Sequence, residues 1–211
     1  MRIVIVLGLP LGILALGNLQ NCMQAADVLP SGEAGATRME AARAEVGNVR
    51  SNVFITLVDL NEARGQPGAA QPKFQAFTNQ LARMETLARA LGKRADEMKE
   101  KGPKYFAEWE AETASIKDSA ARQRAGQHYD ERKQSYDTIN RCMQDARSSF
   151  SQFLQDLTGM KEILGDGTND KTTTVRDLFM HANWRCIDVQ RSLMQIEDEF
   201  DRLAESFRKD Q

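Results

Sequence analysis

The strongest constraint on this chain of 211 residues is a repeated spacing of its apolar side chains. In the C-terminal region every step along the apolar series is three or four residues: Val175, Phe179, Ala182, Cys186, Val189, Leu193, Ile196, Phe200, Leu203 and Phe207. Residues at this spacing share one face of a helix, whereas residues on one face of a strand would alternate. The spacing therefore predicts a long amphipathic helix with one buried face.

Three earlier segments have the same pattern. A capping box, Thr37-Arg38-Met39-Glu40, predicts the start of the first helix, and Gly65 its end. Pro72 suits the first position of the second helix, and Gly102-Pro103 predicts a stop followed by a new start. The second apolar series reads Phe74, Phe77, Leu81, Met84, Ala88, Leu91, Ala95 and Met98.

The third helical region is predicted to run from Lys104 to about Leu164. Its distal half has a regular series, which reads Tyr136, Ile139, Met143, Ala146, Phe150, Phe153, Leu157, Met160 and Leu164. Its proximal half has apolar residues in a different phase, and residues 122–128 between the halves are almost entirely polar. We expect a break, a hinge or an exposed turn at residues 122–128.

Four such segments joined by short Gly/Pro-containing loops predict an all-α fold, an antiparallel helical bundle or coiled coil of about four helices. A third region of about 60 residues would pair with the second helix along one half and with the fourth along the other, at about 1.5 Å per residue. We therefore expect an elongated molecule. All five prolines precede residue 104, in keeping with long helices beyond it.

The N-terminus has the layout of a secretory signal peptide. Arg2 is followed by an unbroken apolar run from Ile3 to Leu16, which is short of the roughly 20 residues that a spanning helix needs. We expect residues 1–26 to be removed, leaving a flexible leader over 27–37 and a helical coiled-coil domain over 38–209. The alternatives are an uncleaved membrane anchor and lipidation at Cys22, and the cleavage site stays open.

Charge excludes one class of partner. The 28 basic and 30 acidic side chains give a formal charge of -2, and removal of residues 1–26 would take away one basic residue, giving 27 minus 30, or -3. Nucleic-acid binding needs a surplus of Lys and Arg, so we expect no nucleic-acid partner. Membrane association is expected only if Cys22 is lipidated or the N-terminal segment stays uncleaved.

Two cysteines follow the N-terminal segment, Cys142 and Cys186. An exported protein meets an oxidising compartment, which makes this pair a candidate disulfide. Counted from the loop at Gly165, however, their positions differ by roughly 13 Å of helix rise, and bridged Cα atoms must lie within about 7 Å. The alternative is that both are small buried apolar side chains.

No motif predicts catalysis or a cofactor. The two histidines, His128 and His181, belong to no metal-binding motif, and the loop from Gly165 to Asp170 lacks the ligand spacing of a calcium loop. Glu108, Glu110 and Glu112 surround Trp109, and the acidic run from Glu197 to Asp201 fits a solvated helix face. We expect no metal site, no cofactor and no enzymatic activity.

Trp184 is the residue most open to a functional reading. Relative to Ala182 and Cys186 it falls on the outward side of the last helix. An exposed tryptophan would be an anchor for a partner, because Trp is enriched at interface hot spots. The alternative is that another helix covers it.

One set of patterned residues resembles a known family of exported bacterial helical proteins, domain of unknown function 2959. The resemblance lies in residues 105–112 and 153–157, and in Arg124, Arg132, Tyr136, Met143 and Ala146. It implies an all-helical fold and an envelope location, and no reaction.

The function expected from the sequence is that of an exported protein of the periplasm or cell envelope. We expect it to act as a structural or protein-interaction module, with a protein partner or self-association through helix faces. The alternative is a helical ligand-binding or regulatory protein of the periplasm.

Overall fold

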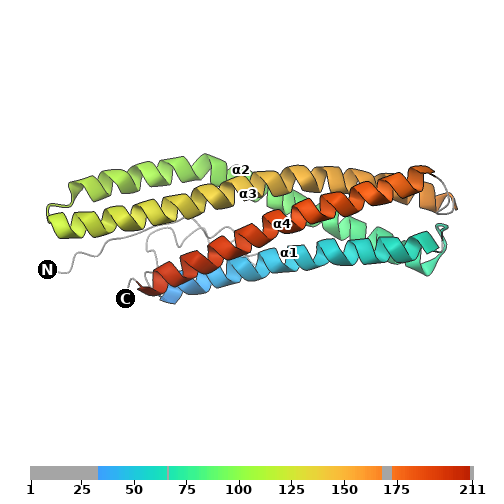
Figure 1. Cartoon of the computed structure of the whole chain (residues 1–211), viewed down its shortest axis with the longest axis horizontal. Helices are drawn as coiled ribbons and strands as arrows, with labels where there is room; N and C mark the ends of the chain where they lie inside the picture. Colours follow the sequence, from blue (N-terminus) through green and yellow to red (C-terminus); the bar gives the residue numbers. More distant parts are fainter. Residues whose placement is uncertain (1–32, 66, 168–172, 210–211) are drawn as a thin grey trace. The chain divides into compact units, whose positions relative to one another are not determined.

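The computed structural model describes residues 33–65, 67–167 and 173–209. Within them the chain forms four α-helices, α1 (Glu33–Gly65), α2 (Pro72–Ser115), α3 (Ser119–Gly165) and α4 (Thr173–Lys209), and no strand (Figure 1). The helices pack antiparallel, which confirms the predicted all-α fold. The expected signal peptide and Cys22 lie outside the described residues. None of the described helices is long and apolar enough to cross a membrane.

The helices form two compact units. The described part of unit 1 comprises residues 33–46, 94–141 and 195–209, and that of unit 2 comprises residues 47–65, 67–93, 142–167 and 173–194. Each unit therefore takes a segment from every helix. The buried side chains of each segment follow the three-and-four spacing of the sequence, as in Leu193, Ile196 and Phe200 of α4.

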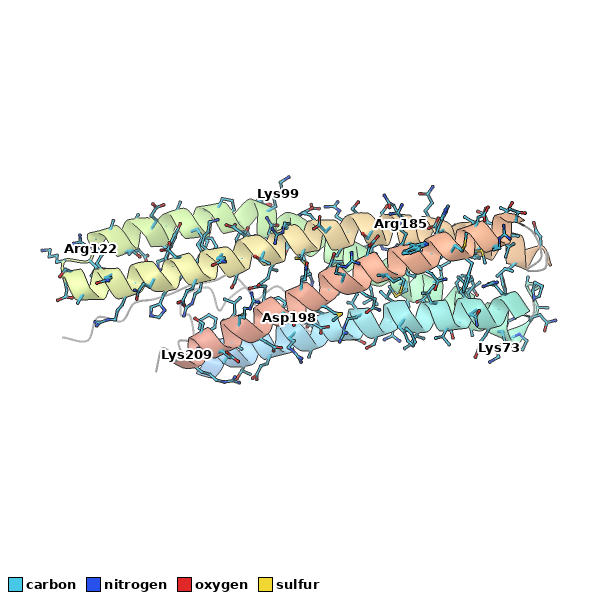
Figure 2. All side chains as sticks on the ribbon, in the orientation of Figure 1. Lys73, Lys99, Arg122, Arg185, Asp198 and Lys209 are labelled. Carbon is cyan, nitrogen blue, oxygen red and sulfur yellow. The ribbon has the colours of Figure 1, made fainter. Side chains whose placement is uncertain are left out.

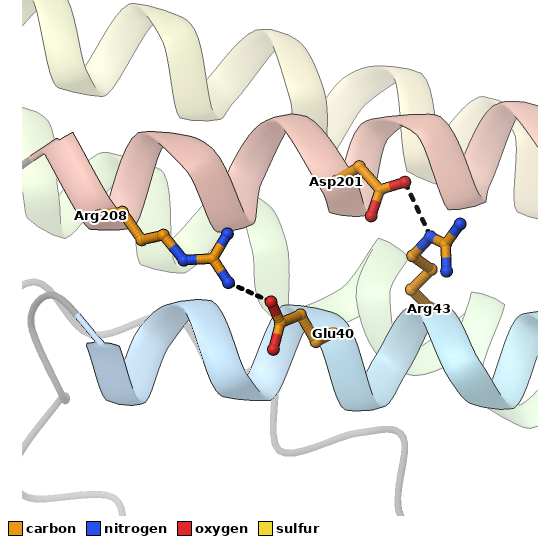
Figure 3. Close-up of polar contacts among 4 residues, drawn as sticks. All are labelled: Glu40, Arg43, Asp201 and Arg208. Atoms are coloured by element: carbon orange, nitrogen blue, oxygen red, sulfur yellow. Dashed lines mark hydrogen bonds and ion pairs between the residues drawn. The ribbon is translucent and has the colours of Figure 1, made fainter.

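In unit 1, ion pairs at the surface join the start of α1 to the end of α4. Arg43 Nε lies 2.7 Å from Asp201 Oδ2, and Arg208 pairs with Glu40 one turn earlier on α1 (Figure 3). The order of these contacts shows that α1 and α4 run antiparallel. Charged side chains project from all four helices (Figure 2), in keeping with the solvated faces expected for a bundle.

In unit 2, a buried amide joins α1 to α2. The Gln80 side chain donates to Asn52 Oδ1 at 3.0 Å, and Asn52 is 3% exposed. At the end of the unit, the Gly68 amide donates to the carbonyl of Leu164 at 2.8 Å. The φ angle of Gly68 is 128°, a backbone conformation that favours glycine. The α1–α2 turn is thereby held against the last turn of α3.

Helix α1 begins at Glu33, earlier than predicted. Residues 33–37 of the expected leader are helical, and Thr37 lies inside the helix instead of capping it. The cause is a tertiary contact within unit 1, since Ala36 is fully buried and a Cβ at Gly35 would lie 2.6 Å from the Phe207 ring. Burial against α4 stabilises a first turn that local signals did not predict.

The predicted helix end at Gly102-Pro103 is wrong, because α2 continues through both residues to Ser115. Gly102 occupies the next position in the buried series after Met98, and a Cβ there would lie 1.8 Å from the Tyr136 hydroxyl oxygen. The glycine therefore admits a side chain from α3. Pro103 is exposed and costs the helix one hydrogen bond, while the packing of Phe106 and Trp109 beyond it keeps the helix intact.

The predicted break at residues 122–128 is also wrong, because those residues belong to α3. The turn lies at residues 116–118, where Asp118 Oδ1 accepts the amide hydrogen bond of Ala121 at 2.7 Å and caps α3. Arg122 donates to the Ile116 carbonyl at 2.7 Å and closes the turn. Buried Ala125 and Arg132 continue the helical spacing towards Tyr136, so the series does not change phase.

Candidate functional site: an exposed apolar face on α1 and α4

Large apolar side chains are exposed in unit 2. Among the described residues, the exposed large apolar side chains all belong to α1 and α4 of unit 2. We call these residues the outer face: Phe54, Ile55, Val58, Met180, Trp184, Ile187 and Met194. Trp184 and Phe54 are the most exposed, at 68% and 63%. A contiguous apolar surface of this kind marks a site of interaction more often than isolated apolar residues do.

On α4 the exposed residues form a stripe along one line of the helix. Met180, Trp184, Ile187 and Met194 follow spacings of four, three and seven residues, and Arg191 divides the last interval into four and three. This is the same heptad spacing that α4 uses on its buried side, displaced to the opposite face. Helix α4 in unit 2 therefore has two apolar faces, of which the bundle covers one.

Two contacts in unit 2 place α1 beside α4 along this stretch. The Gln190 side chain donates to the carbonyl of Arg50 at 2.9 Å. At the other end, the Arg64 guanidinium lies 3.7 Å from the centre of the Phe179 ring. The two contacts show antiparallel neighbours, with residues 50–64 of α1 alongside residues 179–190 of α4.

The exposed residues of α1 lie between these two contacts. Phe54, Ile55 and Val58 are therefore at the level of Trp184 and Ile187 on α4. By the helical spacing, Phe54 lies nearest to the α4 side of α1, Ile55 lies farthest from it, and Val58 lies between them. The outer face thus spans two adjacent helices.

Charged groups lie within and beside the stripe. Arg191 Nη1 lies 3.5 Å from Asp188 Oδ1, and both are exposed or half-buried. Asp156 belongs to the neighbouring helix α3. Burial raises the pKa of its carboxyl, while His181 and Arg185 of α4 act to lower it. His181 is exposed, as expected for a surface residue.

Trp184 is 68% exposed, and none of the helices that the structure describes covers it. The sequence did not predict the exposed residues of α1. The signal was present, since Val53 and Thr56 belong to the buried series and Phe54, Ile55 and Val58 are apolar positions left over from it.

Cys142 and Cys186 are both buried in unit 2, and the structure does not join them in the candidate disulfide. Both match the alternative of small buried apolar side chains, and Cys142 is only 1% exposed. Burial raises the pKa of the Cys186 thiol to about 11, although a hydrogen bond with Gln190 acts in the opposite direction. The thiol is therefore protonated near neutral pH and a poor nucleophile.

Unit 1 contains an aromatic cluster that the sequence analysis did not single out. Phe106 and Trp109 of α2 are nearly parallel, with ring centres 6.1 Å apart, and Tyr129 of α3 packs edge-on against both. Arg132 is 2% exposed, and its guanidinium lies 4.3 Å from the centre of the Phe207 ring. Aromatic residues at helical spacing on α2 and α3 were the available signal.

The described residues offer no group of three His, Cys, Asp or Glu side chains that could hold a metal ion. Burial raises the pKa of the Tyr105 phenol well above its ordinary value, with Arg132 acting to lower it. Tyr105 is therefore protonated at neutral pH. The cluster of unit 1 has the composition of a core, and the outer face of unit 2 is the candidate functional site.

Comparison with known proteins gives one match. A family model described as "Protein of unknown function (DUF2959)" matches residues 37–172, which is more than half of the chain. No curated protein and no solved structure matches the chain.

Proposed function

Since this chain belongs to the DUF2959 family of proteins of unknown function, we propose that it is an exported protein-interaction module of the cell envelope. In this proposal the four helices are a scaffold, and the outer face of α1 and α4 binds a protein partner. No nucleic acid, cofactor or chemical reaction is part of the function. Attachment to the membrane would come from the N-terminal segment or from lipidated Cys22.

The observation that carries the proposal is the exposure of Trp184 at 68%, within a stripe of apolar residues that follows the heptad spacing. Tryptophan combines a large apolar area with a hydrogen-bond donor, and it is enriched among residues that dominate binding energy. Polar residues at these positions would keep α4 equally helical. The exposed parts of the Trp, Ile and Met side chains that are present therefore contribute little to the folding of this chain alone.

The envelope location is supported by the signal-like layout of Arg2 followed by an apolar run. The small negative charge and the mixed charges of the helix faces agree with a protein partner and disagree with a nucleic-acid partner.

The test is site-specific photocrosslinking in cells. A photoreactive phenylalanine analogue, which keeps an aromatic ring at the position, replaces Trp184 in one variant. In the control it replaces Asp198, an exposed residue of the same helix beyond the apolar end of the stripe (Figure 2). We expect a discrete crosslinked product from position 184, absent from position 198 and lost when Ile187→Glu is added. Equal crosslinking from both positions, or none from either, contradicts the proposal.

A fold control accompanies this test. Trp184→Ala should leave the helical circular dichroism and the unfolding midpoint nearly unchanged, because the side chain is mostly exposed. It should also abolish capture of the partner. Unfolding of the variant would instead assign Trp184 to the stability of the bundle.

One observation favours a second candidate, a helical ligand-binding protein. In unit 1, Trp109 Nε1 and Thr113 Oγ1 are buried without a hydrogen-bond partner, and the two residues are one helical turn apart. A small polar ligand that accepted these hydrogen bonds would raise the unfolding temperature. A thermal-shift screen with small carboxylates and sugars tests this, with Trp109→Phe as the variant that should lose the shift.

A further inference from the structure

The positions of the α4 stripe are spaced almost symmetrically about Ile187. Met180 lies seven residues before Ile187 and Met194 seven residues after it. Trp184 lies three residues before it, and Arg191 four residues after. In an isologous contact with twofold symmetry each residue of one chain meets a fixed counterpart of the other, and this order makes the counterparts of Met180 and Ile187 apolar.

We infer that the occupant of the outer face is a second copy of this chain, bound through an antiparallel contact of two α4 stripes centred on Ile187. The inference rests on the proposed function, in which this face binds protein, and it names the partner. Around the twofold axis, Met180 would face Met194 of the second copy, and the two Ile187 side chains would meet.

Arg191 distinguishes a second copy from an unrelated apolar partner. Arg191 belongs to the stripe, so an apolar partner would remove the hydration of its guanidinium and offer no new polar or aromatic contact in return. In the antiparallel self-contact, the indole of Trp184 from the second copy lies at the level of Arg191, and an indole face attracts a guanidinium. The carboxylate of Asp188, 3.5 Å from the guanidinium, also stabilises the charge of Arg191.

A parallel contact lacks this complementarity. It would place Arg191 opposite Arg191 of the second copy, and like charges at such positions are destabilising. The antiparallel arrangement pairs the cation with an aromatic ring on both sides of the axis. The position of Arg191 therefore selects the direction of the second helix.

The length of the stripe limits the strength of the contact. From Met180 to Met194 the helix rises about 21 Å, at about 1.5 Å per residue. Beyond Met194 the same register carries Asp198 and Asp201, and Asp201 is already paired with Arg43. Phe54 and Val58 widen the surface on the α1 side. This is smaller than an interface with about 20 to 30 residues a side, so we expect the dimer to dissociate on dilution.

Cysteine crosslinking in the envelope fraction tests the partner and the direction together. Ile187→Cys should form a disulfide-linked dimer on mild oxidation. Met180→Cys alone and Met194→Cys alone should not, because each residue is about 21 Å from its own counterpart, whereas the two variants produced together should crosslink. Buried Cys142 and Cys186 are present in every sample, and Glu205→Cys, at an exposed position of α4, is the matched control.

Dilution of the purified chain tests the Arg191–Trp184 contact. Arg191→Ala should raise the dimer dissociation constant about tenfold, because two symmetry-related cation–π contacts are lost. In a Trp184→Ala background the same change should have little further effect. Arg202→Ala, which removes an exposed cation from α4 outside the stripe, should leave the constant unchanged.

The outcomes separate the two proposals. A chain that stays monomeric at every concentration, while position 184 still crosslinks to a different protein, overturns the second-copy inference and leaves the proposed function standing. Self-crosslinking of Met180→Cys alone overturns the antiparallel direction. A monomer that yields no crosslinked product from position 184 overturns both.

Discussion

The hydroxyl of Tyr136 on α3 donates a 2.5 Å hydrogen bond to the main-chain carbonyl of Met98 on α2, in unit 1. The contact lies one turn before Pro103, which has no amide hydrogen to donate to the carbonyl of Lys99. A tertiary hydrogen bond therefore supports the helix where proline weakens its own.

Tyr136→Phe should lower the free energy of unfolding by about 1 kcal/mol, since it removes one buried hydrogen bond and keeps the ring. Amide hydrogen exchange should increase in α2 around Met98 more than in α4. Chemical denaturation and exchange measured on the same variant check both expectations. Unchanged exchange in α2 would mean that the hydroxyl does not support this part of the helix.

Gly102→Ala should destabilise the protein by about 2 to 4 kcal/mol, because the new Cβ would lie 1.8 Å from the Tyr136 oxygen and the buried ring has little room to move. Gly126→Ala is the matched control, since its Cβ would meet nothing within 4 Å in the interior of α3. That change should stabilise by about 0.5 to 1 kcal/mol through helix propensity. Thermal denaturation of the two variants should give shifts of opposite sign.

Two cross-helix ion pairs of unit 1 should differ in value. Arg94 and Glu45 are 3.1 Å apart, with side-chain exposures of 11% and 27%, whereas Arg43 and Asp201 are about half exposed. Glu45→Gln should cost about 1 to 3 kcal/mol, because it leaves the charge of Arg94 in a poorly hydrated place. Asp201→Asn should cost below about 1 kcal/mol and should lose its effect in high salt. Equal costs at high salt would contradict the distinction.

Alkaline pH should destabilise unit 2 through Cys186. Its pKa is raised by burial from 9.0 to about 11, so the folded state holds the thiol proton more tightly than the unfolded state. The stabilisation is complete below about pH 9 and is lost as pH rises through about 11. Cys186→Ala should therefore show a smaller fall of unfolding free energy between pH 9 and 11 than the unaltered chain.

The same burial predicts slow alkylation. At pH 8 a thiol reagent should label Cys186 slowly in the folded protein and rapidly in denaturant, because only the thiolate reacts and the native site disfavours it. Rapid labelling of the native protein would place Cys186 at a more open site than the one described.

The helical character of the chain was predictable because a spacing of three and four needs only local geometry. Val189, Leu193 and Ile196 could be assigned to a buried face without knowledge of what they touch, and all three are fully buried. The first helix start, the second helix end and the turn before α3 were not predictable in the same way. The first two depend on packing against side chains of other helices. The third depends on the cap at Asp118, and Asp is a residue type that also occurs where no helix begins.

The candidate functional site was likewise only partly predictable from the sequence. The sequence placed Trp184 on the outward side of its helix, but an outward side is covered or exposed according to the number and position of the other helices. Phe54 and Val58 could not be singled out from the sequence, because they lie beside α4 only in the folded chain, where Gln190 donates to the carbonyl of Arg50.

The sequence by itself determined that this chain forms long amphipathic helices, because apolar periodicity and the cost of exposing one full face act within each segment. The tertiary structure alone decided which irregular residues belong to those helices. Gly102 and buried Arg132 continue a buried series because Tyr136 and Phe207 fill the space beside them. It also decided which second apolar face remains open, since burial is a property of the packed helices and not of the residue.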